Sequence, residues 1–442
     1  MVFLQTAGRH RGGRGAAGSV RCVCKIADVN PMKLVWKLLT SLRLTVVLLA
    51  LGIVLVFVGT VAQADEGLYT AQTRYFKHWF VFGLSFFGQR VPLPLPGGYL
   101  LGTALLINLL AAHIQRFQWT WKKIGIHLTH TGVIVLLVGQ LTTDLSSRET
   151  MLRFAEGETK NYSESARDYE LVFTSDVGDG REEVVSIPER RLRNGGEIKT
   201  ASLPFTVRIK NFWANSDPSF RAPMQENAPP LTTNGLARYF DFRPSPEAKA
   251  MDERNIPSAL IEMTTVTGSL GEWVVSDWAG ETGLAASVSN NFARQLGEQM
   301  AGRIAGRLAE PQSIRVGGKE FSFTIRPERT YRDFSLTLLN FTHARYLGTD
   351  IPKDFRSRVR LENPQTREHR EVEIYMNTPL RYQGETFYQA SFDQLDPRVS
   401  ILQIVRNPGW LTPYAGCIIV AAGLLTQFLM HLIGFISKRR TA

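Results

Sequence analysis

The chain has 442 residues, of which 44% are hydrophobic and 10% aromatic, and this apolar content is too high for a disordered protein. The formal net charge of +11 would by itself suggest a nucleic-acid-binding protein. The positions of the charges exclude that class, because all of the excess lies beside long uncharged stretches. Those stretches also exclude a purely cytosolic enzyme.

Four stretches contain no Asp, Glu, Lys or Arg: residues 44–64, 91–115, 124–143 and 407–437, which are 21, 25, 20 and 31 residues long. A helix needs about 20 apolar residues to cross about 30 Å of hydrocarbon. We therefore predict transmembrane helices at about 44–64, 97–115, 124–143 and 408–437. The first three lie within residues 32–143.

Basic residues flank these spans on one side. Residues 1–43 carry eight Lys or Arg and one Asp, the 116–123 segment carries three basic residues, and the 438–442 tail carries three. The positive-inside rule places these three flanks together in the cytoplasm. A loop at 65–96 and the body at 144–407 then lie outside.

The first 31 residues form a Gly- and Arg-rich leader without apolar periodicity, and we interpret them as disordered. No cleavage site follows the first span, so the leader is not a secretory signal peptide. Met32 opens a segment typical of an ordinary start, which leaves open that the assigned start lies too far upstream.

Residues 144–407 have the texture of a β protein, with short alternating runs between turn residues. We predict a strand at 205–211, one hairpin from 259–265 and 272–277, and a second from 358–362 and 371–376. A helical insertion is predicted at 291–308, where Phe292, Leu296, Met300 and Ile304 recur every four residues. The predicted fold is an α-helical membrane protein with four transmembrane helices and a large, mostly β extracytoplasmic domain inserted between helices 3 and 4.

No motif in the sequence indicates hydrolase or kinase chemistry. The 144–407 body has no cysteine and cannot itself exchange thiols with a partner. Four of the eight histidines lie inside predicted spans instead, in their cytoplasmic halves: His113, His127, His130 and His431. An ionisable group within a span is a candidate functional residue, and neutral imidazole is the usual protein ligand of haem iron.

All four are candidates for cofactor binding, with different expectations. His127 and His130 are three residues apart and share a helix face. We expect His113 and His127 to make interhelical hydrogen bonds or to lie among headgroups, and the deeper His130 to be a metal ligand. For His431, one turn after Gln427, both interpretations stay open. The outer His343 and His369 are expected to be solvated surface residues.

Several segments resemble the ResB/CcsB family of cytochrome c biogenesis. They are the first span with its outer Gly-Thr and Gln63, and residues 355–361, 376–391, 407–409 and 414–416. The resemblance also covers the order of three spans, an outer β domain and a last span. It implies a bacterial inner-membrane protein of system II, which acts with a CcsA-type membrane protein to move haem across the membrane and attach it to apocytochrome c.

Within that family a histidine near the start of the third span ligates haem together with one from the partner subunit. Aligning on Gly139 places His130 at this position. The resemblance thus implies His130 as a ligand of the iron of a transiently bound haem, and apocytochrome c and a thioredoxin-like redox protein as further partners. The partner's tryptophan-rich motif and outer ligand histidines have no counterpart here. We therefore expect a non-catalytic subunit of a cytochrome c synthetase-type complex rather than an enzyme by itself.

A different class of protein remains as an alternative. A membrane-anchored ligand-binding or sensor protein without haem would use its helices only as an anchor, and it would not require histidines within its spans. The 376–391 block shows no catalytic pair and is expected to serve packing, because its Asn, Pro and Gly residues are typical of turns.

Overall fold

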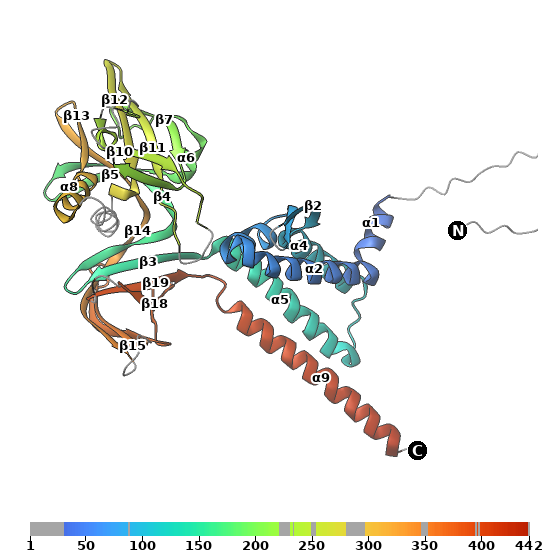
Figure 1. The fold of residues 1–442 in the computed structure, drawn as a ribbon. Coiled ribbons are helices and arrows are strands. Elements are labelled where there is room, and N and C mark those ends of the chain that lie inside the picture. The colour runs from blue at the N-terminus through green and yellow to red at the C-terminus, as the bar shows by residue number, and fades with distance from the viewer. Residues whose placement is uncertain are drawn as a thin grey trace, which may run out of the picture.

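The fold was obtained as a computed structural model, which describes residues 31–86, 89–220, 230–232, 234–248, 253–279, 297–345, 352–393, 396 and 398–440. The long helices α2 (Leu42–Glu66), α4 (Gly98–Gln115), α5 (Ile124–Ser146) and α9 (Thr412–Arg440) and a β-rich region occupy opposite ends of the molecule (Figure 1). Residues 1–30 of the predicted leader, and Phe292 and Leu296 of the predicted insertion, lie outside the described residues.

Within the described residues, four helices are long and apolar enough to cross a membrane, which confirms that part of the prediction. The helices are α1 (Pro31–Leu39), α2 (Leu42–Glu66), α3 (Leu68–Ala71), α4 (Gly98–Gln115), α5 (Ile124–Ser146), α6 (Glu189–Asn194), α8 (Glu298–Leu308) and α9 (Thr412–Arg440). The four candidate spans are α2, α4, α5 with the preceding 3₁₀ turn η2 (Trp121–Lys123), and α9. Most of them extend beyond the uncharged stretches, since charged residues such as Arg43 and Glu66 occupy helix ends.

The segment expected as an outer loop is ordered. After α2 the chain forms α3, a π-helical turn η1 (Gln72–Phe76), and an antiparallel hairpin of β1 (Phe80–Phe86) and β2 (Gln89–Pro96). Gly97 and Gly98 join this hairpin to α4, and a Cβ at either position would collide with the backbone of the η1–β1 connection. The hairpin is therefore packed tightly onto the helices.

The structure contains a large β-rich region, which confirms the predicted mostly β domain. Its strands are β3 (Arg148–Ala155), β4 (Thr159–Gly178), β5 (Arg181–Pro188), β6 (Gly196–Ile198), β7 (Thr206–Trp213), β8 (Ser216–Phe220), β9 (Asn234–Gly235), β10 (Phe240–Pro244), β11 (Ser258–Thr265), β12 (Gly268–Ser276), β13 (Gln312–Val316), β14 (Lys319–Arg345), β15 (Pro352–Asn363), β16 (Glu368–Tyr375), β17 (Leu380–Tyr382), β18 (Glu385–Phe392) and β19 (Val399–Arg406). The predicted strand at 205–211 is part of β7. Both predicted hairpins form, as β11–β12 and β15–β16.

Two lobes of the β-rich region share one ten-stranded sheet, because β4 and β14 are long enough to run through both (Figure 1). In the upper lobe this sheet packs on a five-stranded sheet of order β6-β7-β11-β12-β9, with Phe173, Ile261 and Phe323 in the shared core. In the lower lobe Phe154, Leu338 and Leu402 form a second core. β3 and β19 pair side by side, so the ends of α5 and α9 meet the same part of the sheet.

Close helix packing explains the position of α9, which runs antiparallel along α5. Gly125, Gly132 and Gly139 are buried on one face of α5 at seven-residue intervals. Their Cα atoms lie against α9, where Gly423 and Gly416 oppose the first two. Small residues let two helix backbones approach closely, which is the usual basis of helix association in membranes.

The described part of the predicted helical insertion is helical, which confirms that part of the prediction. Residues 298–308 of the predicted 291–308 segment form α8, and residues 291–296 lie outside the described part of the chain.

Candidate functional site

Three of the four predicted histidines lie around one cavity. His113 lies in the last turn of α4, and His127 and His130 lie in the first two turns of α5. Because only a short connection separates these antiparallel helices, their joined ends are adjacent. The His113 ring lies 5.1 Å from the His127 ring and 5.8 Å from the His130 ring, measured between centroids.

The cavity has a volume of about 570 Å³ and is bounded by α2, α4 and α5. This is within the range of about 300–1,000 Å³ that is usual for small-molecule sites. Its wall is mainly apolar, with Leu49, Leu105 and Val133 among the lining residues. All three histidines are half-buried and line it.

Hydrogen bonding fixes part of the chemistry of these rings. The Nε2 atom of His127 lies 2.9 Å from the carbonyl oxygen of Gln118 and donates to it, which assigns the remaining lone pair to Nδ1. The Nδ1 atoms of His127 and His130 are buried and have no hydrogen-bond partner within the described residues. A buried imidazole nitrogen without a partner is costly, and an external ligand that accepts its lone pair removes that cost.

Two cations also line this cavity, and the sequence predicted them only as basic flanks of the spans. Arg116 donates to the carbonyl oxygen of Thr40 at 3.0 Å, and Lys123 donates to Gln118. A further polar residue, Asn108, is 1% exposed and binds the α1–α2 junction through Leu39 and Thr45. A polar residue in an apolar span indicates such a contact, although Asn108 was not predicted as a site residue.

His431 does not join this group. It lies on the exposed surface of α9, where its Nε2 is 2.8 Å from the side-chain nitrogen of Gln427. On α5, the glycine face turns toward α9 while the two histidines line the cavity bounded by α2 and α4. α9 is therefore packed against the opposite side of α5 from the cavity.

The three imidazoles do not converge on a point that could hold a bare metal ion, and no other group of three His, Cys, Asp or Glu residues does so among the described residues. The arrangement instead presents individual imidazole nitrogens to a shared apolar space. This suits a ligand that takes one or two axial nitrogens and fills the space with its own apolar surface.

A larger cavity of about 700 Å³ lies between η1 and the β-rich region. Its charged residues largely pair with one another: Arg193 binds Glu189 at 2.8 Å and Glu247 at 3.5 Å. The Arg167 guanidinium lies 3.6 Å from the centroid of the Tyr69 ring. The Arg167–Tyr69 contact connects the two parts of the molecule, whereas the Arg193 pairs lie within the β-rich region. His78 is the one histidine among the described lining residues, so the cavity offers no imidazole pair comparable with the helical site.

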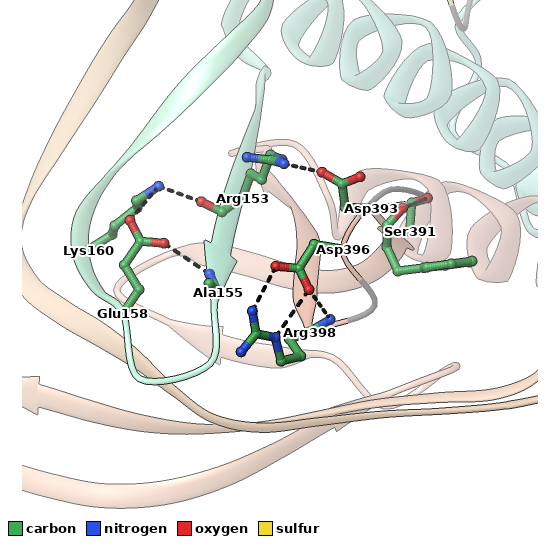
Figure 2. Close-up of polar contacts among 9 residues, drawn as sticks. Arg153, Ala155, Glu158, Lys160, Ser391, Asp393, Asp396 and Arg398 are labelled. Carbon is green, nitrogen blue, oxygen red and sulfur yellow. Dashed lines mark hydrogen bonds and ion pairs between the residues drawn. The ribbon is translucent and has the colours of Figure 1, made fainter. Parts of the chain in front are cut away.

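The lower β lobe carries a second polar cluster at the β18–β19 turn. Figure 2 shows Asp393 of this turn paired with Arg153 of β3, while Lys160 donates to the Arg153 carbonyl oxygen at 2.7 Å. Asp396 accepts from the Arg398 backbone N–H at 3.0 Å, and that N–H together with the Arg398 guanidinium lowers the pKa of Asp396. The cluster holds the turn against the neighbouring β3–β4 hairpin, and its described residues include no nucleophile–base pair.

The expectation for His343 is wrong. Its ring is half-buried beside Phe392 at 4.3 Å and is parallel to Phe355 at 5.6 Å. The β14–β15 pairing places Phe355 opposite His343, and β18 contributes Phe392. His369 is exposed and lies 3.2 Å from Glu362, in accord with a surface position.

Two comparisons with known proteins bear on this chain. Residues 312–400 match the ResB-like family, which confirms the family resemblance noted in residues 355–361 and 376–391. A 103-residue segment is 35% identical to Protein NrfI of Wolinella succinogenes. That segment covers 23% of this chain and 11% of the relative's length.

Proposed function

Since residues 312–400 form a ResB-like segment, we propose that this protein is a membrane assembly factor for c-type cytochromes that holds haem between its helices and acts with a CcsA-type partner. A role in cytochrome c biogenesis is supported by the family match and by the similarity to NrfI. The observation that carries the haem proposal is the cavity of about 570 Å³ with buried imidazole nitrogens on its wall.

Haem fits this site as a substrate. Its porphyrin face is apolar, its iron takes axial imidazole nitrogens, and its two propionates are anionic. His130 would provide an axial nitrogen, and the apolar wall would exclude water from the ring. Arg116 and Lys123 place two positive charges beside the same space, which is complementary to the propionates.

The membrane layout belongs to the same proposal. We place the β-rich region outside the bacterial inner membrane, inserted between the third and fourth spans, and both termini in the cytoplasm. Supporting this layout, α1 and the end of α9 lie at the end of the molecule opposite the β-rich region (Figure 1). The Trp36 indole donates to Gln115 at 2.6 Å, so the basic start of the helical part lies beside the basic 116–123 connection.

The outer region would hold apocytochrome c, and a thioredoxin-like redox protein as a further partner, near the outer ends of the spans. The paired β3 and β19 strands support this geometry, because they continue directly from α5 and into α9. The chain itself would act as a subunit that positions haem and not as the site of attachment chemistry.

The test is His130→Ala in a complex with its CcsA-type partner. Loss of the bound haem absorption and of cytochrome c maturation is expected, with unchanged protein level and partial rescue by added imidazole. His431→Ala is the matched control, since this histidine lies outside the cavity, and it should retain haem. Full haem content and maturation in His130→Ala would refute the ligand assignment, whereas a loss confined to His113→Ala or His127→Ala would move it to that ring.

A further inference from the structure

The β1–β2 hairpin has apolar residues on both of its faces. Val81 and Leu95 face the helices and are 2% and 6% exposed, in one core with Leu55 and Val58 of α2. The opposite face carries Phe80 and Phe82, which are 56% and 73% exposed. A two-stranded sheet on a water-facing surface normally alternates apolar and polar faces, and this one does not.

Exposed apolar side chains continue around the described part of the hairpin. Trp79 precedes β1, and Val91 and Leu93 lie on β2, all largely exposed. Pro94 is exposed beside Phe82, its partner in the strand register. The hairpin packs on α2, and α2 itself presents exposed Val54 and Phe57.

The free edge of β2 lacks backbone donors at two positions. The Gly97 N–H donates to the Trp79 carbonyl oxygen at 2.9 Å, so residues 79 and 97 are a hydrogen-bonded pair. Hydrogen-bonded pairs alternate with non-hydrogen-bonded pairs in an antiparallel sheet, so the next hydrogen-bonded pair is Val81 and Leu95. The backbone groups of residues 94 and 96 then point to the free edge. Both residues are proline and have no N–H to leave unpaired.

On the β1 side, two backbone carbonyl oxygens bind a side chain of the same chain. Arg74 donates to the carbonyl oxygens of Phe82, at 2.9 Å, and of Gly83, and it also pairs with Glu66. Phe76, two residues later, packs its ring against Gly59 of α2. These contacts place the hairpin beside the last two turns of α2, near the outer end of the proposed spans.

We propose that the β1–β2 hairpin lies in the outer lipid–water interface and anchors this end of the helical bundle by inserting Phe80, Phe82 and Leu93 among phospholipid chains. The donor-poor edge disfavours a protein that adds a strand, because strand addition needs paired donors and acceptors. Lipid is favoured by continuity with the apolar surface of α2 and by Trp79, whose side chain type concentrates at membrane interfaces. This proposal rests on the membrane layout proposed above.

Spin-label accessibility in proteoliposomes tests the proposal. Cys22, Cys24 and Cys417 are replaced by serine, and a nitroxide is attached to Phe82→Cys, Val266→Cys or Phe428→Cys in the full chain. Val266 is the aqueous reference, 106% exposed at the β11–β12 turn, and Phe428 is the hydrocarbon reference, 63% exposed on α9. At position 82, collisions with oxygen should exceed those with a water-soluble nickel chelate, at a depth shallower than at position 428.

Two results at position 82 would overturn the hairpin proposal alone. Free access of the nickel chelate, as at position 266, would place the hairpin in water. Low access of both reagents would indicate that protein covers it. A water-like result at position 428 would overturn the membrane layout together with the hairpin proposal, which separates the two failures.

Discussion

Replacing Gly132 by alanine should separate α9 from α5. A Cβ at position 132 would lie 2.6 Å from the Val420 Cγ2 atom, 2.8 Å from the Val420 backbone nitrogen and 2.9 Å from the Gly416 carbonyl oxygen. Ordinary contacts between carbon atoms are about 3.5–4.0 Å, so α9 must retreat by about 1 Å. A gap of this size forfeits about a quarter to a half of the dispersion energy of the contacts that it opens.

The free-energy change has two opposing parts. Alanine in place of glycine favours a helix by about 0.5–1 kcal/mol. Overpacking of a close interface costs about 1–3 kcal/mol. Gly52→Ala in α2 is the matched control, because a Cβ there meets nothing within 4 Å and experiences only the helix term. Gly132→Ala should therefore be less stable than Gly52→Ala by about 1–3 kcal/mol.

Unfolding by sodium dodecyl sulfate in mixed micelles, followed by far-ultraviolet circular dichroism, gives the comparison. Gly132→Ala combined with Val420→Ala should recover only part of the loss, since the two backbone contacts of the new Cβ remain. Equal stability of Gly132→Ala and Gly52→Ala would refute the close-packing explanation. Complete recovery in the double variant would assign the clash to the Val420 side chain alone.

Three further predictions concern the β-rich region and the proposed membrane layout. Arg332 makes two hydrogen bonds to Glu385, and the two side chains are only 8% and 14% exposed. Arg332→Ala should therefore lower the free energy of unfolding in urea by about 3–5 kcal/mol. Arg358→Ala, which breaks the exposed pair with Glu371, should lower it by about 0–1 kcal/mol. Burial raises the pKa of the Glu189 carboxyl despite its pair with Arg193, so the folded state binds this proton more tightly than the unfolded state does. The stability of the protein should therefore fall as the pH rises from the usual glutamate range through the raised pKa. Glu189→Gln should abolish this part of the pH dependence of the melting temperature, and an unchanged pH profile in the variant would contradict the argument. Reporter fusions after Arg116 and Lys438 should report the cytoplasm and one at Gly317 the outside, whereas a cytoplasmic signal at Gly317 would overturn the layout.

Local sequence patterns predicted the elements whose signal is contained within a few residues. Absence of charge located the four long helices, because apolar length is the main requirement of a spanning helix. Alternation located β11 and β12, since their inward residues, Ile261 and Val275 among them, are completely buried. The β1–β2 hairpin was missed because its prolines argue against a strand, and only an edge strand tolerates them.

Pairings between distant segments were not contained in such patterns. β3 pairs with β19 across about half of the chain, and β4 and β14 join the two lobes through many residues with two shifts in register. Such long-range contacts depend on how complete surfaces fit, which a local pattern does not specify. The same holds for His343, whose neighbours Phe355 and Phe392 come from other strands.

The histidines show where the two kinds of information meet. Sequence position separated His130 from His113 and His127 by estimated depth, yet the short 116–123 connection brings all three rings to one cavity. Depth along a helix is a one-dimensional measure and contains no information about which way a side chain faces. On α5 that direction is set by the glycines, because the face that must contact α9 cannot also face α4. The seven-residue glycine spacing is visible in the sequence, and it therefore predicts which side of α5 is left for His127 and His130.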